Sequence, residues 1–191
     1  IGDPTARITE DPLRLLRAVR FKNSLGFHYA EDTLEAIRQA VDDGITEQIA
    51  TDRLRQEFSR MLIHPSRKQA VLDLDRLGIL SRVLPEVTRG KGVEQPPDLH
   101  AEGDVWIHTL LAIDALPKQP SERLAWATLL HDIGKPPTQT LPADNHDRIR
   151  FSRHYAVGAE MAEGLLRRLQ FSNRLTREIC WMIEHHINID D

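Results

Sequence analysis

The stretch LLHDIGKP, from Leu129 to Pro136, is the feature that most constrains how this chain folds. It ends an apolar run of helical spacing and places an imidazole and a carboxylate on the adjacent residues His131 and Asp132. Gly134 and Pro136 then predict the end of the helix, because glycine and proline are common just beyond a helix C-terminus. An imidazole beside a carboxylate suits a divalent transition metal. The stretch therefore predicts a metal site at the end of a helix.

Further candidate ligands lie at or near the ends of the neighbouring amphipathic stretches. One histidine lies in WIHTLLAIDAL, another opens HYAVGAEMAEGLL, and an adjacent pair follows ICWMIE. A single histidine on a helix is more often a bystander than a ligand, whereas one per helix converging on the His-Asp pair forms a ligand set. We expect His108, His131 and Asp132 at the core, with His154 and one of the adjacent pair completing one or two sites. The candidate ligands are His108, His131, Asp132, His154, His185 and His186.

Arranged this way, these residues resemble the HD family of metal-dependent phosphohydrolase domains. Imidazole nitrogens with one carboxylate favour Ni²⁺, Mn²⁺, Fe²⁺ or Zn²⁺ over Mg²⁺. The resemblance implies cleavage of small exposed phosphoesters, such as 2′,3′-cyclic ends or nucleoside monophosphates, by a metal-activated water. The predicted catalytic residues are His131, Asp132 and Lys135, and Lys135 is expected on the lip of the following polar loop, where it would hold a phosphate.

The alternative for this region is a helical module that holds RNA, in which the histidines only hydrogen-bond one another. It stays open because HD domains commonly take their last ligand from an aspartate on a later helix. Asp190 and Asp191 follow His186 so closely that neither is expected to reach the cluster.

The composition indicates a globular intracellular chain. The 191 residues carry mixed charges with a net charge of −4, which allows one or two domains. No apolar run is long enough to span a bilayer, no secretory signal is visible, and a single cysteine, Cys180, permits no internal disulfide. We predict a cytoplasmic protein without a membrane partner. The missing initiator methionine and the turn-like start Gly2-Asp3-Pro4 predict a piece of a larger protein.

The first segment combines a helix start with a basic stripe. Thr9-Glu10-Asp11-Pro12 predicts a helix capped by Asp11, with proline at its first position. Arginines then recur every third residue, at Arg14, Arg17 and Arg20. The whole string IGDPTARITEDPLRLLRAVRF resembles the junction between the catalytic head and the neck of bacterial tRNA nucleotidyltransferases (CCA-adding enzymes) and their poly(A) polymerase relatives. The following segments resemble the rest of the neck and an appended HD domain, so the resemblance covers essentially the whole chain.

The E-D-x-x-R element of this string has a chemistry of its own. Adenine and cytosine each present an amino donor beside a ring-nitrogen acceptor, and guanine and uracil present the reverse order. A carboxylate and a guanidinium held side by side therefore accept the first two bases and reject the others. Asp11 and Arg14 lie three residues apart, on one face of a helical turn. The resemblance implies that these two read the base of ATP or CTP, that Glu10 holds the arginine, and that Arg17 belongs to the same site; the alternative for Asp11 is a helix N-cap alone.

Periodicity predicts an all-α chain of two helical domains. A neck domain is expected over residues 1–88 and an HD-type domain over 97–191, joined by the linker RGKGVEQPPD, with neck helices over 29–41, 51–63 and 66–77. Basic residues of the neck, among them Arg53, Arg60 and Arg67, are candidates to contact RNA backbone, although a solvated face is the better interpretation for any one of them.

Two functional hypotheses follow. In the first, the chain is the neck and HD region of a tRNA nucleotidyltransferase that binds a tRNA or RNA 3′ end and uses Mg²⁺ for transfer. No segment with the paired carboxylates of a two-metal site is visible, so this chain alone is not expected to transfer nucleotides. In the second, it is a free-standing HD phosphohydrolase acting on nucleotides. The sequence does not distinguish CCA, CC or A addition from poly(A) synthesis.

Overall fold

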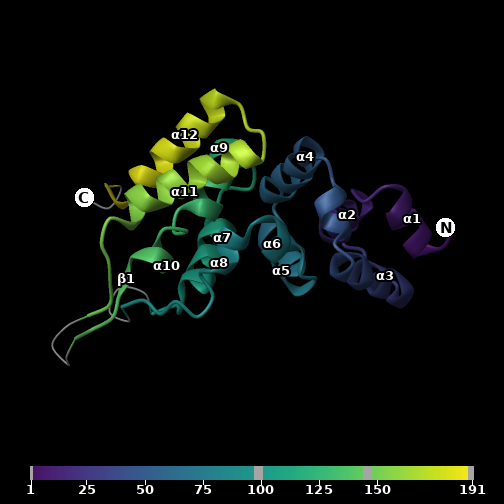
Figure 1. The fold of residues 1–191 in the computed structure, drawn as a ribbon, viewed down its shortest axis with the longest axis horizontal. Helices are drawn as coiled ribbons and strands as arrows, with labels where there is room; N and C mark the ends of the chain where they lie inside the picture. Colours follow the sequence, from purple (N-terminus) through teal and green to yellow (C-terminus); the bar gives the residue numbers. More distant parts are fainter. Residues whose placement is uncertain (1, 97–100, 144–147, 189–191) are drawn as a thin grey trace.

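The computed structural model describes residues 2–96, 101–143 and 148–188, and nearly all of its regular structure is helical (Figure 1). Within these residues the only strands are β1 (Gln139–Thr140) and β2 (Arg150–Phe151). They pair antiparallel in one short ribbon, with Gln139 opposite Phe151. The all-α prediction is confirmed. None of the helices in the described ranges has the length and apolar character needed to cross a membrane.

The N-terminal helices occupy one end of an elongated molecule, and the C-terminal helices occupy the other (Figure 1). The elements of the first half are α1 (Pro4–Glu10), α2 (Arg14–Leu25), α3 (Glu31–Asp42), η1 (Ile45–Gln48), α4 (Thr51–Leu62), α5 (Arg67–Arg76), α6 (Ile79–Val83) and α7 (Pro85–Thr88). Those of the second half, besides the two strands, are α8 (Val105–Ala115), α9 (Glu122–Leu130), α10 (Lys135–Thr138), α11 (His154–Arg168), α12 (Asn173–Glu184) and η2 (His186–Asn188).

The start of the chain differs from the prediction, because a helix precedes the expected one. Asp3 caps α1 by accepting a hydrogen bond from the backbone N–H of Thr5 at 3.0 Å. The helix buries Ile8 and packs against α3. Asp11 is the residue that ends α1, and α2 begins at Arg14. The predicted cap is therefore wrong: Asp11 is the C-cap of α1, and Leu13 occupies the N-cap position of α2 without a side-chain hydrogen bond. Of the two Asp-Pro pairs, Asp3-Pro4 is the one that starts a helix.

A continuous hydrophobic core joins the two halves. Trp126 of α9 is fully buried, and its ring lies 6.4 Å from Phe58 of α4 and 5.2 Å from Phe171, measured between centroids. Its indole N–H donates to Ser59 at 2.9 Å, and the hydroxyl of Ser59 donates to Glu122 at 2.6 Å. The predicted boundary between residues 88 and 97 stays a prediction, since α4 packs directly on the helix that leads to His131.

Arg67 is a buried residue of this contact, neither solvated nor available to RNA. Its guanidinium lies at the C-terminal end of α8 and donates to backbone carbonyls of the last turn and of the residues that follow it. The acceptors there are Ile113 (3.4 Å), Leu116 (3.2 Å), Pro117 (2.8 Å) and Lys118 (3.2 Å). The charge also complements the negative end of the helix dipole. Arg67 therefore fixes α5 of the neck to the end of α8.

Gly134 has a different role from the predicted helix stop. Helix α9 already ends at Leu130, and Gly134 precedes the short helix α10. A Cβ atom on Gly134 would lie 2.1 Å from the carbonyl oxygen of His154 and 2.5 Å from the backbone nitrogen of Gly158. The missing side chain therefore allows the HD segment to lie directly against the first turn of α11, which brings Asp132 close to His154.

Candidate functional site

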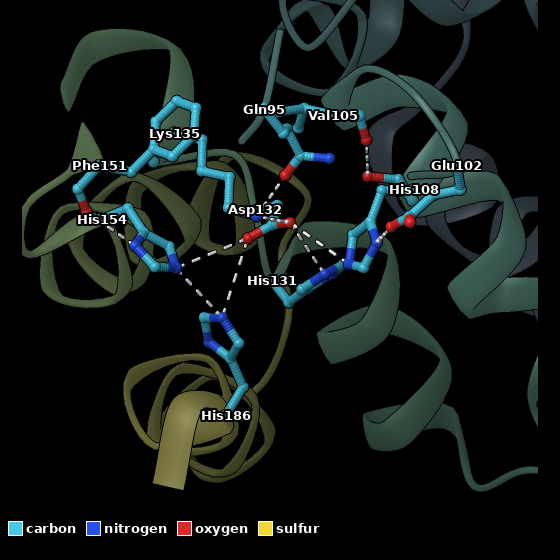
Figure 2. A network of polar contacts seen from close by, with 12 residues as sticks. Gln95, Glu102, Val105, His108, His131, Asp132, Lys135, Phe151, His154 and His186 are labelled. Atoms are coloured by element: carbon cyan, nitrogen blue, oxygen red, sulfur yellow. Dashed lines mark hydrogen bonds and ion pairs between the residues drawn. The ribbon is translucent and has the colours of Figure 1, made fainter. Parts of the chain in front are cut away.

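Asp132 lies at the centre of four imidazole rings that come from different parts of the chain (Figure 2). Its side chain is almost completely buried. One carboxylate oxygen, Oδ2, lies 3.1 Å from Nε2 of His131 and 3.6 Å from Nε2 of His108. The other oxygen, Oδ1, lies 3.7 Å from Nε2 of His154 and 3.8 Å from Nε2 of His186. The carboxylate thus joins two groups of candidate ligands, one at each oxygen.

Each of the four rings is held from behind through its other nitrogen. The Nδ1 contacts are His131 with the carbonyl of Thr128 (2.8 Å), His154 with that of Phe151 (2.9 Å), His186 with that of Ile183 (2.6 Å), and His108 with the carboxylate of Glu102 (2.6 Å). Carbonyl and carboxylate oxygens only accept, so the ring proton belongs on Nδ1 and the lone pair of Nε2 faces Asp132. This is how proteins orient histidines that ligate a metal.

One buried oxygen of Asp132 lacks a close donor. Within the described residues, Oδ1 has no hydrogen-bond partner, and the ammonium of Lys135 lies 2.8 Å from the other oxygen, Oδ2. The Nε2 atoms of His154 and His186 face each other across only 3.3 Å. Two nitrogen lone pairs and a buried carboxylate oxygen at such distances are unfavourable unless a cation lies between them. The donor set therefore fits a divalent transition metal, while it does not distinguish Ni²⁺, Mn²⁺, Fe²⁺ and Zn²⁺.

The pKa shifts of three of the four rings also suit a metal. Burial disfavours the charged form of Asp132, but the neighbouring His131 and Lys135 outweigh this and hold the pKa of its carboxyl far below the usual range. Burial likewise opposes the charged form of His131, and the adjacent carboxylate still raises its pKa. Burial lowers the pKa of His108, His154 and His186. These three rings are therefore neutral near pH 7, as metal ligands must be.

Lys135 lies inside the site, whereas the sequence predicted it on the lip of a loop. Its side chain is almost fully buried, and its ammonium lies 2.8 Å from Oδ2 of Asp132. It also donates to the side-chain oxygen of Gln95 at 2.6 Å. Gln95 belongs to the predicted linker, so part of that segment lines the candidate site. Nothing in the sequence marked Gln95 or Glu102, because both lie in loops whose path depends on the packed structure.

A cavity of about 530 Å³ opens beside the cluster. The cluster residues and Lys135 form one part of its wall, and Arg148, Arg150 and Phe151 form another. Arg148, Arg150 and Phe151 belong to the stretch that the sequence placed close to the candidate metal ligands. Part of this stretch forms α10 and the two strands, where the sequence predicted a loop. The lining combines cations, an aromatic ring and the candidate metal ligands, which is a suitable environment for a phosphoester attached to an organic group.

The adjacent histidines at the end of α12 have different environments. His186 belongs to the cluster, whereas the ring of His185 stacks on Trp181 at a centroid distance of 4.6 Å. His185 belongs to neither of the two groups of candidate metal ligands around Asp132. Of the two adjacent histidines, His186 is therefore the candidate ligand. Asp190 and Asp191 lie outside the described residues.

The predicted base-reading residues lie at the junction of α1 and α2. Glu10 accepts from the guanidinium of Arg14 at 3.0 Å and from Arg7 at 3.0 Å, and these contacts lower the pKa of its carboxyl. Asp11 accepts from the backbone N–H of Leu13 at 3.3 Å, a local contact of the kind that caps a helix. Asp11 also holds Arg53 of α4, with both oxygens 3.3 Å from guanidinium nitrogens.

Comparison with known proteins matches both parts of the chain. Residues 105–191 match the HD domain family, and residues 26–90 match the family described as the probable RNA and SrmB-binding site of polymerase A. A multifunctional CCA protein of Nitrosospira multiformis is 34% identical over 181 residues, which is 93% of this chain. An A-adding tRNA nucleotidyltransferase of Deinococcus radiodurans is 35% identical over 183 residues, also 93% of this chain. The chain belongs to the tRNA nucleotidyltransferase and poly(A) polymerase family. The predicted family resemblance is confirmed.

The chain spans 42% of the length of each of these two family members. A solved structure titled as a tRNA-processing enzyme complex shares the fold, with a TM-score of 0.52 and 20% identity. It covers 96% of this chain, which in turn covers 42% of that chain. In the present chain, the segments that match the HD family and the RNA-binding family leave residues 91–104 between them. Gln95 and Glu102, which support the candidate metal centre, lie in that interval.

Proposed function

We propose that the HD region of this chain is a metal-dependent phosphohydrolase for small phosphoesters, within an enzyme that processes the 3′ end of tRNA. The observation that carries the proposal is the convergence of four imidazole Nε2 atoms on the buried carboxylate of Asp132. A divalent metal bound there would lower the pKa of a coordinated water and supply the nucleophile. His108, His131, Asp132, His154 and His186 are the residues that would hold it.

The other side chains of the cavity have roles that follow from their contacts. An ammonium group has three N–H donors, and those of Lys135 that do not serve Gln95 and Asp132 can reach a phosphate oxygen in the cavity. The positive charge of Arg150 favours an anionic substrate at the same opening. Phe151 offers a ring against which the base or sugar of a nucleotide end can pack.

The test uses the wild-type chain after removal of metal with a chelator. We expect hydrolysis of a generic phosphodiester and of a 2′,3′-cyclic nucleotide to return with Ni²⁺, Mn²⁺, Fe²⁺ or Zn²⁺ and much less with Mg²⁺, because the donor set is rich in imidazole. Elemental analysis after dialysis should find retained metal. No retained metal and no hydrolysis above the blank would favour the alternative, a helical module that only holds RNA.

The residues at the junction of α1 and α2 support a second proposed function, the selection of the incoming nucleotide. Glu10 holds the guanidinium of Arg14, which begins α2. Asp11 lies between the two helices, where its carboxylate contacts Arg53. We propose that Asp11 and Arg14 accept ATP and CTP in an enzyme that also carries a Mg²⁺-dependent transfer head. The match of residues 26–90 to an RNA-binding family supports this proposal over a free-standing phosphohydrolase.

In such an enzyme, Asp11→Ala or Arg14→Ala should relax or abolish the preference for ATP and CTP over GTP and UTP. Both side chains are at least partly exposed, so the fold should persist. Incorporation of each of the four nucleotides into a tRNA 3′ end measures the effect. Arg38→Ala, on the exposed side of α3, is the matched control and should leave selectivity unchanged. Wild-type selectivity in both neck variants would rule out base reading by these residues.

A further inference from the structure

The segment between α7 and α8 is bound to the body of the molecule in its described part, where the sequence predicted a linker. The carbonyl of Gly90 accepts from the backbone N–H of Trp106 at 3.2 Å, and that of Val93 accepts from Val105 at 3.1 Å. These N–H groups belong to the first turn of α8 and have no acceptor within the helix. Residues 90–95, called the strap below, are therefore fixed to the start of α8.

The last residue of the strap holds the ammonium of Lys135 (Figure 2). The side chain of Gln95 is buried, and its oxygen accepts from Lys135 at 2.6 Å. Its amide nitrogen donates to the carbonyl of Gly103 at 3.3 Å, so both ends of the amide are used. Lys135 lines the cavity beside the metal ligands, and Gln95 is not among the lining residues that the structure describes. A ligand in the cavity therefore meets Lys135, whose direction Gln95 helps to set.

The other end of the strap is tied to the neck. The ammonium of Lys91 pairs with the carboxylate of Asp75 in α5 and lies 5.3 Å from the centre of the Trp106 ring. Only 17% of the Asp75 side chain is exposed, so the ion pair is partly shielded from water. Lys91 and Gln95 are four residues apart, a stretch that spans at most about 14 Å. A displacement of α5 against α8 would therefore reach Gln95 through a short and well-anchored stretch of chain.

We propose that the strap couples the neck to the phosphohydrolase site by setting, through Gln95, the direction of the Lys135 ammonium. The inference rests on the proposed function of the HD region and names how that site is regulated. An ammonium has three N–H donors in a fixed arrangement, and Asp132 and Gln95 take two of them. The direction of the third is then fixed before a phosphate arrives, which lowers the cost of binding it.

The coupling gives the position of α5 an effect on phosphate binding. Helix α5 lies within residues 26–90, the segment that matches the RNA-binding family, so a ligand that binds there and moves α5 changes the direction of the ammonium. A second ion pair joins the same two helices without touching the strap. Lys68 of α5 pairs with Asp114 of α8 at 2.9 Å, and it provides a matched control.

The first test removes the acceptor of Lys135. Gln95→Met keeps the length of the side chain and loses its oxygen, whereas Gln95→Glu keeps an acceptor. Isothermal titration calorimetry of the chelator-treated chain with inorganic phosphate measures the anion site without the metal. Gln95→Met should weaken phosphate binding about 3- to 10-fold, and Gln95→Glu should recover at least part of the loss. After metal is restored, Gln95→Met should raise KM for a phosphodiester more than it lowers kcat, with unchanged metal content.

The second test separates the strap from the general contact between α5 and α8. Lys91→Gln should weaken phosphate binding about 2- to 3-fold, the effect of a partly exposed ion pair. Lys91 is 44% exposed, so the fold should persist in this variant. Lys68→Gln should leave phosphate binding unchanged. Added to Gln95→Met, Lys91→Gln should cause no further loss, because both changes act through one contact.

Equal phosphate affinity of Gln95→Met and the wild-type chain, or no measurable phosphate binding by the wild-type chain, would overturn the positioning of Lys135. Equal effects of Lys91→Gln and Lys68→Gln would overturn the coupling to the neck. These outcomes leave the proposed function intact, since hydrolysis by the wild-type chain is measured separately. The expected variant effects on phosphate binding in a chain that does not hydrolyse phosphoesters would support the strap and reject the phosphohydrolase.

Discussion

Replacing Asp132 with asparagine is expected to remove both retained metal and phosphoester hydrolysis. Asparagine keeps the shape of the side chain but lacks the negative charge that both groups of imidazoles share. Loss of an outer-shell partner alone commonly costs 10- to 100-fold in metal affinity or activity, so loss of the shared ligand should lower the hydrolysis rate by at least about 100-fold. The metal content after dialysis, measured by elemental analysis, should fall to background.

The variant also leaves the buried ammonium of Lys135 with Gln95 as its remaining close partner. Removing one member of a buried ion pair typically costs about 3 kcal/mol or more, so the unfolding midpoint in urea should fall as well. The adjacent histidines provide a control that separates metal loss from unfolding. His186→Ala removes one Nε2 and keeps the Asp132–Lys135 pair, so it should lose metal while staying folded. His185→Ala should retain both metal and activity, and equal behaviour of the two variants would contradict the assignment.

Gly134→Ala is expected to destabilise the chain severely. The new methyl group would lie 2.1 Å from the carbonyl oxygen of His154 and 2.5 Å from the nitrogen of Gly158, both backbone atoms that cannot turn away. This steric clash can be relieved only if α10 moves away from α11. We expect the free energy of unfolding to fall by about 3 kcal/mol or more, the upper range for overpacking. For a chain of this size that corresponds to a melting temperature lower by roughly 6–12 °C.

Gly164→Ala is the matched control for this change. It makes the same substitution in the interior of α11, where a Cβ would meet nothing within 4 Å. Alanine should stabilise the helix there by up to about 1 kcal/mol, so the two melting temperatures should move in opposite directions. The Gly134 variant should also bind metal more weakly, since the separation moves Asp132 away from His154. An unchanged melting temperature for Gly134→Ala would show that the close backbone contact does not exist.

Local sequence signals predicted the helices well and their ends less well. The apolar spacing that predicted helices over 29–41 and 51–63 corresponds to α3 and α4, shifted by at most two residues at either end. The first helix was missed because Asp3-Pro4 and Asp11-Pro12 are the same local signal, and only the packed structure, in which Ile8 is buried, shows that the first pair starts a helix and the second ends it. Arg67 shows the same limit, since its sequence context resembles that of a surface arginine and its burial depends on the end of α8.

The sequence by itself determined the helical class, the family, and the His-Asp pair with one candidate ligand per helix, because residue spacing along a helix encodes which side chains share a face. The tertiary structure decided that His186 and not His185 joins the cluster, since the rotation at the end of α12 is set by packing. It also decided that Gln95 and Glu102 support the site, and that Lys91 ties the segment of Gln95 to α5. These contacts join residues far apart in the chain, and no local spacing carries that information.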